Sequence, residues 1–131
     1  MKYLPIIAGI LLGLLFVAFS VPFFVPPLLE KMMANTPPMS ENAKTFMTLF
    51  MATGYMKFIK TFELIGGILV AIPRTRNFGL LILGPIIINI LAFHGFITKG
   101  EGLFDPMLIV IVALTLYLLW CGRKAFAGLA N

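Results

Sequence analysis

Cysteine, histidine and acidic residues are scarce in this sequence, which has one Cys, one His and five Asp plus Glu among 131 residues. A single cysteine, Cys121, cannot form an intrachain disulfide, and the absence of a CxxC motif excludes a dithiol enzyme that oxidises quinones through paired thiols. One His and one Cys are also too few for a metal cluster or for a nucleophile with its base. We therefore expect no catalytic residue and no metal site, and a protein that is not an enzyme by itself.

Charge is also scarce: charged residues make up 11% of the chain and hydrophobic residues 60%, with a mean hydropathy of +1.04. Soluble domains have about 25% charged and about 45–50% apolar residues. The composition indicates an integral membrane protein whose residues 1–131 form one domain. The apolar N-terminal run continues to Val25, too long for the core of a signal peptide, so we expect a retained anchor despite the small residues at Ala18-Phe19-Ser20.

Four apolar segments are long enough to cross a bilayer. The predicted fold is all-α: an integral membrane four-helix bundle, up-down-up-down, with short interfacial helices in the first extracytoplasmic connection. Whether residues 26–53 lie on the membrane or in it stays open. Ser40 and Asp105 are expected as N-caps, Asn77 is expected to cap the third span, and Pro85 is expected to kink it. The predicted spans are about 3–25, 54–73, 77–96 and 106–122.

Cations gather in the N-terminus, the second connection and the C-terminus, which share one membrane side if there are four spans. The positive-inside rule then predicts a multi-pass protein of the plasma (inner) membrane with both termini in the cytoplasm. The cations on this side are Lys2, Arg74, Arg76, Arg123 and Lys124, whereas the other connections mix Lys31, Lys44 and Lys99 with Glu30, Glu41, Glu101 and Asp105.

The second span contains three charged residues, Lys57, Lys60 and Glu63. A charge near the bilayer centre costs at least about 2.5–3.5 kcal/mol on insertion scales. The presence of three charges in one span therefore requires a structural or functional explanation. Lys60, Glu63 and Gly67 share one helical stripe, which allows Lys60 and Glu63 to pair and lets another helix or a ligand approach Gly67. Lys57 is expected to extend to the outer interface. Two roles stay open for Lys60 and Glu63: an ion pair that only stabilises the bundle, or a site that binds a ligand or a proton.

The third span contains two polar residues, Asn89 at a depth comparable to that of Glu63, and His94 nearer the outer end, about level with Lys57. From the helical rise, Glu63 and Asn89 are roughly 13 Å and 10 Å from the outer ends of their spans, so Asn89 is placed to hydrogen-bond the carboxylate. His94 has two interpretations: it belongs to the candidate site, or it only makes hydrogen bonds at the membrane interface. The candidate ligand-binding residues are Lys57, Lys60, Glu63, Gly67, Asn89 and His94.

Small, soft and aromatic side chains suggest two kinds of contact. Gly9 and Gly13 form a GxxxG motif, which suits either packing within the bundle or a homo-oligomer. Methionines and phenylalanines gather in the outer half, where adaptable side chains suit an apolar ligand or a variable partner. They include Met32, Met33, Met39, Met47, Met51, Met56, Met107, Phe23, Phe46, Phe50, Phe58, Phe93 and Phe96.

The segment from Gly54 to Gly95 resembles the DoxX family of small four-span membrane proteins. The resemblance is carried by Lys60-Thr61-Phe62-Glu63-Leu64-Ile65-Gly66-Gly67 and by the following span with Asn89 and Phe93-His94. It implies a subunit of a quinone-linked oxidoreductase or of another redox-associated membrane complex, but it transfers no catalytic residue.

The predicted function is a non-enzymatic membrane subunit or scaffold of a redox-associated complex. Its polar cluster would bind a quinone or a lipid-like molecule, and its partners would be the bilayer and a membrane or redox protein, with no nucleic acid. The alternative is a small proton-coupled transporter that uses Glu63. Lys60 opposes this alternative, because a neighbouring cation favours the ionised carboxylate.

Overall fold

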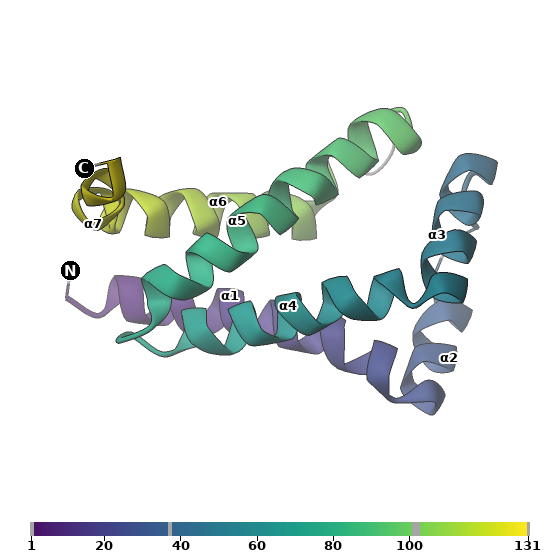
Figure 1. Ribbon diagram of the computed structural model, residues 1–131, viewed down its shortest axis with the longest axis horizontal. Helices are drawn as coiled ribbons and strands as arrows, with labels where there is room; N and C mark the ends of the chain where they lie inside the picture. Colours follow the sequence, from purple (N-terminus) through teal and green to yellow (C-terminus); the bar gives the residue numbers. More distant parts are fainter. Residues whose placement is uncertain (1, 37, 101–102, 131) are drawn as a thin grey trace.

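The computed structural model describes residues 2–36, 38–100 and 103–130, and over these residues the chain is helical without a strand (Figure 1). The all-α prediction is therefore confirmed. Glu101, counted above among the charges of the other connections, lies outside the described residues, as does Pro37.

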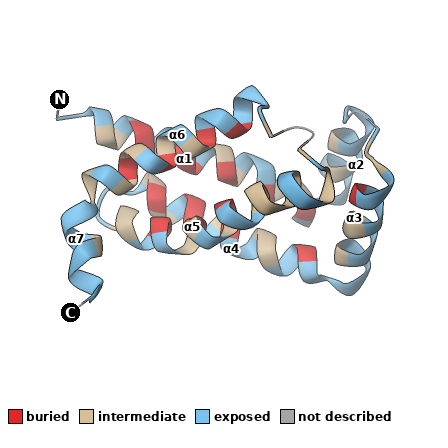
Figure 2. Ribbon diagram, turned by 90° about the horizontal axis from the view of Figure 1, so that it is seen from above, coloured by how far each residue is buried: buried red, intermediate tan, exposed pale blue. Residues whose placement is uncertain are grey.

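Four long helices form the body of the molecule: α1 (Leu4–Ser20), α4 (Tyr55–Ala71), α5 (Arg76–Ala92) and α6 (Pro106–Cys121). Helix α1 packs against α4 and α6, and α4 packs against α5. Figure 2 shows the buried residues on the facing sides of these helices. The core they share includes Leu12, Phe16, Val70, Leu80, Leu83, Ile111 and Leu118.

Both termini and the turn between α4 and α5 lie at one end of the molecule (Figure 1). This end carries Lys2, Arg74, Arg76, Arg123 and Lys124 and is called the cationic end below. The first connection and the segment between α5 and α6 lie at the opposite end. The cations of the N-terminus, the turn between α4 and α5 and the C-terminus therefore share one end of the molecule.

Among the described residues, two helical segments are long and apolar enough to cross a membrane. They are α1 with the 3-10 turn η1 (Val21–Phe24), and α5 with the π-helical turn η2 (Phe93–Ile97). A third is added if α6 counts as one broken span with α7 (Arg123–Ala127) and η3 (Gly128–Ala130), across a bend of 71°.

The first connection folds into two further helices, α2 (Pro26–Ala34) and α3 (Glu41–Thr53). Helix α2 begins at Pro26, because a proline at the first helical position loses no hydrogen bond. Helix α3 ends at Gly54, whose φ of +80° is a left-handed conformation, and α4 starts at the next residue. Helix α3 is therefore not a continuation of α4, and Figure 1 shows it turned away from the α4 axis.

Helix caps follow the sequence signals in two of three cases. Ser40 Oγ accepts a hydrogen bond from Ala43 N at 3.3 Å, and Asp105 Oδ1 accepts one from Met107 N at 2.9 Å. Asn77 was expected to cap α5, and this prediction was wrong. Helix α5 begins at Arg76, Thr75 holds the N-cap position, and its hydroxyl donates to the Leu69 carbonyl instead.

Candidate functional site

A buried ion pair links two consecutive turns of α4. Lys60 Nζ lies 3.2 Å from Glu63 Oε2 and donates a hydrogen bond to Glu63 Oε1 at 3.3 Å. The Glu63 side chain is 4% exposed and that of Lys60 is 14% exposed, so the carboxylate is sealed more completely than the ammonium. The predicted pairing of these residues within one helix is therefore confirmed.

An aromatic ring covers the ammonium side of the pair. Lys60 Nζ lies 4.6 Å from the centroid of the Phe23 ring, and Phe23 is itself buried in η1. A cation over an aromatic face gains about 0.5–2 kcal/mol, the larger value where both are desolvated. The pair therefore fastens α4 to the end of α1. Sequence reasoning missed Phe23 in this role, because nothing in its spacing from Lys60 indicates a contact.

Glycine brings α1 and α4 close together beside the pair. A Cβ atom added to Gly13 would overlap the Gly67 carbonyl oxygen, and one added to Gly9 would lie 2.7 Å from the Val70 carbonyl oxygen. A Cβ on Gly67 would lie 3.1 Å from Phe16 Cβ. The GxxxG motif is thus occupied inside the chain, and a homo-oligomer through Gly9 and Gly13 would have to displace α4.

The structure does not bring the other candidate residues to the pair. Lys57 is exposed, in keeping with a lysine that reaches the interface. Asn89 is also exposed, and its side-chain amide donates to the Pro85 carbonyl at 2.9 Å, so the expected hydrogen bond to Glu63 was wrong. His94 is half-buried, and its Nδ1 lies 2.9 Å from the Ile90 carbonyl oxygen, one turn back. Lys60, Glu63 and Gly67 remain as one cluster.

Aromatic side chains form a continuous series at the opposite end from the cationic end. Phe46 stacks on Phe50 with centroids 4.0 Å apart and contacts Phe93 at 4.7 Å, which ties α3 to η2. Phe50 contacts Tyr55 at 4.8 Å, so the series crosses the break at Gly54. The rings of this outer region therefore stabilise the position of α3 by contacting one another.

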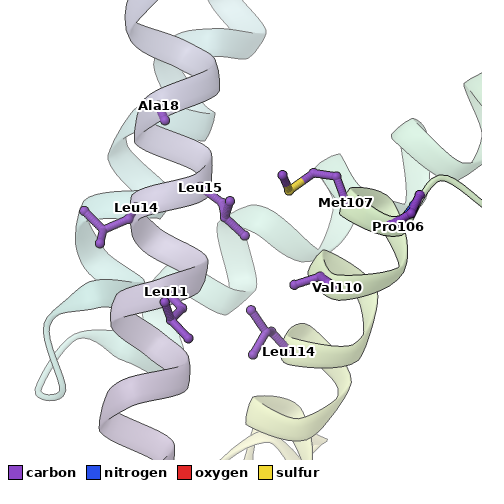
Figure 3. Close-up of a pocket in the computed structure, with 8 residues that line it drawn as sticks. All are labelled: Leu11, Leu14, Leu15, Ala18, Pro106, Met107, Val110 and Leu114. Carbon is purple, nitrogen blue, oxygen red and sulfur yellow. The ribbon is translucent and has the colours of Figure 1, made fainter.

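An apolar groove runs between α1 and α6 (Figure 3). Its volume is about 580 Å³, within the range of small-molecule sites. Figure 3 shows side chains of the two helices facing each other across it, with Met107 and Pro106 at one end. The lining is entirely apolar and consists of Leu11, Leu14, Leu15, Ala18, Pro106, Met107, Val110 and Leu114.

This groove suits a hydrocarbon chain. From Leu11 to Ala18 it extends about 10 Å along α1, by the helical rise. No lining side chain offers a hydrogen bond, so a polar head would have to lie outside it. Sequence reasoning did not find this groove, because it forms between helices that are distant in the chain.

Comparison with known proteins gives one partial match and no family. No family model matches the chain, so the resemblance to the DoxX family stays a prediction. No solved structure matches it. The chain is similar to the uncharacterised protein YwoB of Bacillus subtilis (strain 168), with 32% identity over 75 residues, covering 57% of this chain and 47% of that protein. The matched part thus spans about half the length of this relative.

Proposed function

We propose that the protein is a non-enzymatic four-span membrane protein that serves as a subunit or scaffold and holds a lipid-like hydrocarbon chain between α1 and α6. The all-apolar groove of Figure 3 is the observation that carries this proposal. In this proposal α1, α4, α5 and α6 cross the plasma (inner) membrane, and the cationic end, with both termini, faces the cytoplasm.

The outward faces of all four long helices support membrane insertion. Each carries large apolar side chains that are at least two-fifths exposed, which in water would be an aggregation hazard. In a bilayer the same side chains contact lipid at no cost. They include Ile7 and Ile10 on α1, Ile65 and Ile68 on α4, Leu81 and Ile88 on α5, and Ile109 and Leu116 on α6.

The Lys60–Glu63 pair acts in this proposal as a structural lock and not as the ligand site. Its two charges satisfy each other, and Phe23 covers the remaining side of the ammonium. The same pairing opposes the alternative of a proton-coupled transporter, because a carrier must release the carboxylate from its cation in every cycle. Uptake into proteoliposomes driven by a pH gradient, and abolished by Glu63→Gln, would support the transporter instead.

Membership of a redox-associated complex is supported by the DoxX-like residues Lys60, Glu63, Gly66 and Gly67. A quinone fits the same proposal as a phospholipid, because its polyprenyl tail is a hydrocarbon chain that can enter the apolar groove while its ring stays outside. The mass of the bound molecule distinguishes the two.

A tryptophan at Val110 is expected to block the groove. Val110 lines it from α6, so an indole there would occupy the space of the bound chain. Losing the burial of about two methylene groups costs about 1.6 kcal/mol, which lowers occupancy about tenfold. We expect Val110→Trp to co-purify with far less phospholipid or quinone than wild type, as measured by native mass spectrometry from mild detergent.

Ile109→Trp is the matched control. Ile109 is the preceding residue of α6, is also exposed, and does not line the groove. Equal lipid or quinone occupancy in wild type, Val110→Trp and Ile109→Trp would show that the groove holds nothing, and the proposal would fail.

A further inference from the structure

A second pocket lies at the cationic end, where the start of α5 meets the junction of α6 and α7. Its volume is about 420 Å³. Unlike the groove, it is lined largely by polar and charged groups. The lining residues are Arg76, Asn77, Cys121, Gly122, Arg123, Lys124 and Ala125.

The charge of this pocket is not balanced within it. Arg76, Arg123 and Lys124 contribute three cations, and the seven described lining residues include no acid. The acids of the chain lie elsewhere in the sequence, at Glu30, Glu41, Glu63, Glu101 and Asp105. Three cations around one cavity repel one another unless an anion joins them.

Two neighbouring residues of the pocket carry polar atoms without a partner. Among the described residues, the buried side-chain atoms that lack a hydrogen bond are Arg76 Nε, a donor, and Asn77 Oδ1, an acceptor. A buried polar atom left unpaired costs about 1–3 kcal/mol, so each such atom in a native fold needs an explanation. Both atoms belong to adjacent residues that line the cationic pocket, so the polar side chains at the start of α5 are not fully satisfied within the described part of the chain.

With the long helices crossing the bilayer as in the proposed function, on which this step rests, the pocket lies at the level of the lipid headgroups. The Arg123 guanidinium lies 4.0 Å from the centroid of the Trp120 ring and donates to the Trp120 carbonyl at 2.8 Å. A tryptophan at the end of an apolar helix, followed by basic residues, is typical of the membrane–water interface. The 71° bend between α6 and the segment 123–130 leaves the cations beside the start of α5.

We infer that this pocket binds the headgroup of an anionic phospholipid, of which phosphatidylglycerol is the simplest probe. The phosphodiester oxygens accept hydrogen bonds from the guanidinium groups of Arg76 and Arg123, with Lys124 adding charge. This site is separate from the groove of the proposed function, because the two share no lining residue.

The experiment measures lipid adducts on the full chain by native mass spectrometry. Phosphatidylglycerol and phosphatidylcholine with identical acyl chains are added in equal amounts, so the tails cannot account for a difference. We expect wild type to prefer phosphatidylglycerol, and Arg76→Gln and Arg123→Gln each to lower this preference about tenfold or more, as for the loss of a charge-assisted hydrogen bond.

Arg74→Gln is the matched control, because Arg74 is exposed in the same turn but does not line the pocket. It is expected to keep the wild-type preference. If it reduces the preference as much as Arg76→Gln does, the effect is diffuse charge and the inference is overturned. Arg123 is exposed on α7, so its replacement reports on the site even if Arg76→Gln fails to fold.

Two further measurements test whether the pocket binds a lipid headgroup or a free anion, and whether this binding is independent of the groove. Inorganic phosphate at millimolar concentration should not displace phosphatidylglycerol; if it does, the pocket is a site for a free anion and the lipid assignment is overturned. Val110→Trp should leave the headgroup preference unchanged, whether or not the groove binds a chain. Loss of the preference in Val110→Trp would mean that both results report the groove, and would overturn this second site.

Discussion

Glu63→Gln is expected to destabilise the protein by about 3–5 kcal/mol, the cost of removing one partner of a buried ion pair. Glutamine keeps the shape of the side chain but leaves the Lys60 ammonium without a counter-charge in a site where it is 14% exposed. The free energy of unfolding is measured in detergent by following helical circular dichroism through an SDS titration.

A double substitution separates the missing charge from lost packing. Lys60→Met with Glu63→Leu removes both charges and keeps apolar volume, and replacing a buried pair in this way is often neutral or stabilising. We expect the double variant to be clearly more stable than Glu63→Gln. Lys57→Gln is the control, because Lys57 lies on the same helix but is exposed. This substitution should change the free energy of unfolding by less than about 0.5 kcal/mol. If Glu63→Gln is as mild as Lys57→Gln, the pair is not a lock.

Gly13→Ala is expected to destabilise the contact of α1 with α4 by about 2–3 kcal/mol, in the range of overpacked cores. The new methyl group would overlap the Gly67 carbonyl oxygen and lie 2.7 Å from Ala71 Cβ, so backbone would have to move. Gly67→Ala should be milder, because its nearest neighbours are 3.1 Å away. The same SDS titration gives the order of the two variants.

Gly95→Ala is the control for a glycine in a helical turn that has open space around it, because nothing lies within 4 Å of the added atom and the next residue is not a proline. Alanine there should leave stability unchanged or raise it by up to about 1 kcal/mol, through helix propensity alone. A Gly95→Ala loss equal to that of Gly13→Ala would show that close approach of α1 and α4 is not the cause.

The helices and the ion pair could be predicted because their signals are local. Ser40 and Asp105 are strong N-caps, Gly54 and Pro73 separate α4 from its neighbours, and a three-residue spacing brings Lys60 to Glu63. Each of these inferences needs only residues within about one helical turn.

The position of Asn89 could not be predicted, because depth in a bilayer says nothing about rotation around a helix axis. The buried face of α5 is set by Gly79, which approaches the α4 backbone, and continues through Leu83 and Ile87. Asn89 follows Ile87 by two residues, or about 200° of rotation, and therefore points away from α4. The pocket at Arg76 and Asn77 could not be predicted for a related reason, because it forms where α5 contacts a segment some 45 residues later in the chain.

The contact of the Phe23 ring with Lys60 also bears on whether protons could leak through a bilayer that the bundle spans. An ammonium group in hydrocarbon ordinarily draws in water, and a file of water molecules conducts protons. Here the aromatic face takes the place of that hydration on one side and the Glu63 carboxylate on another. In the proposed bilayer setting, the bundle is therefore expected to hold two opposite charges in its interior without drawing in such a file of water.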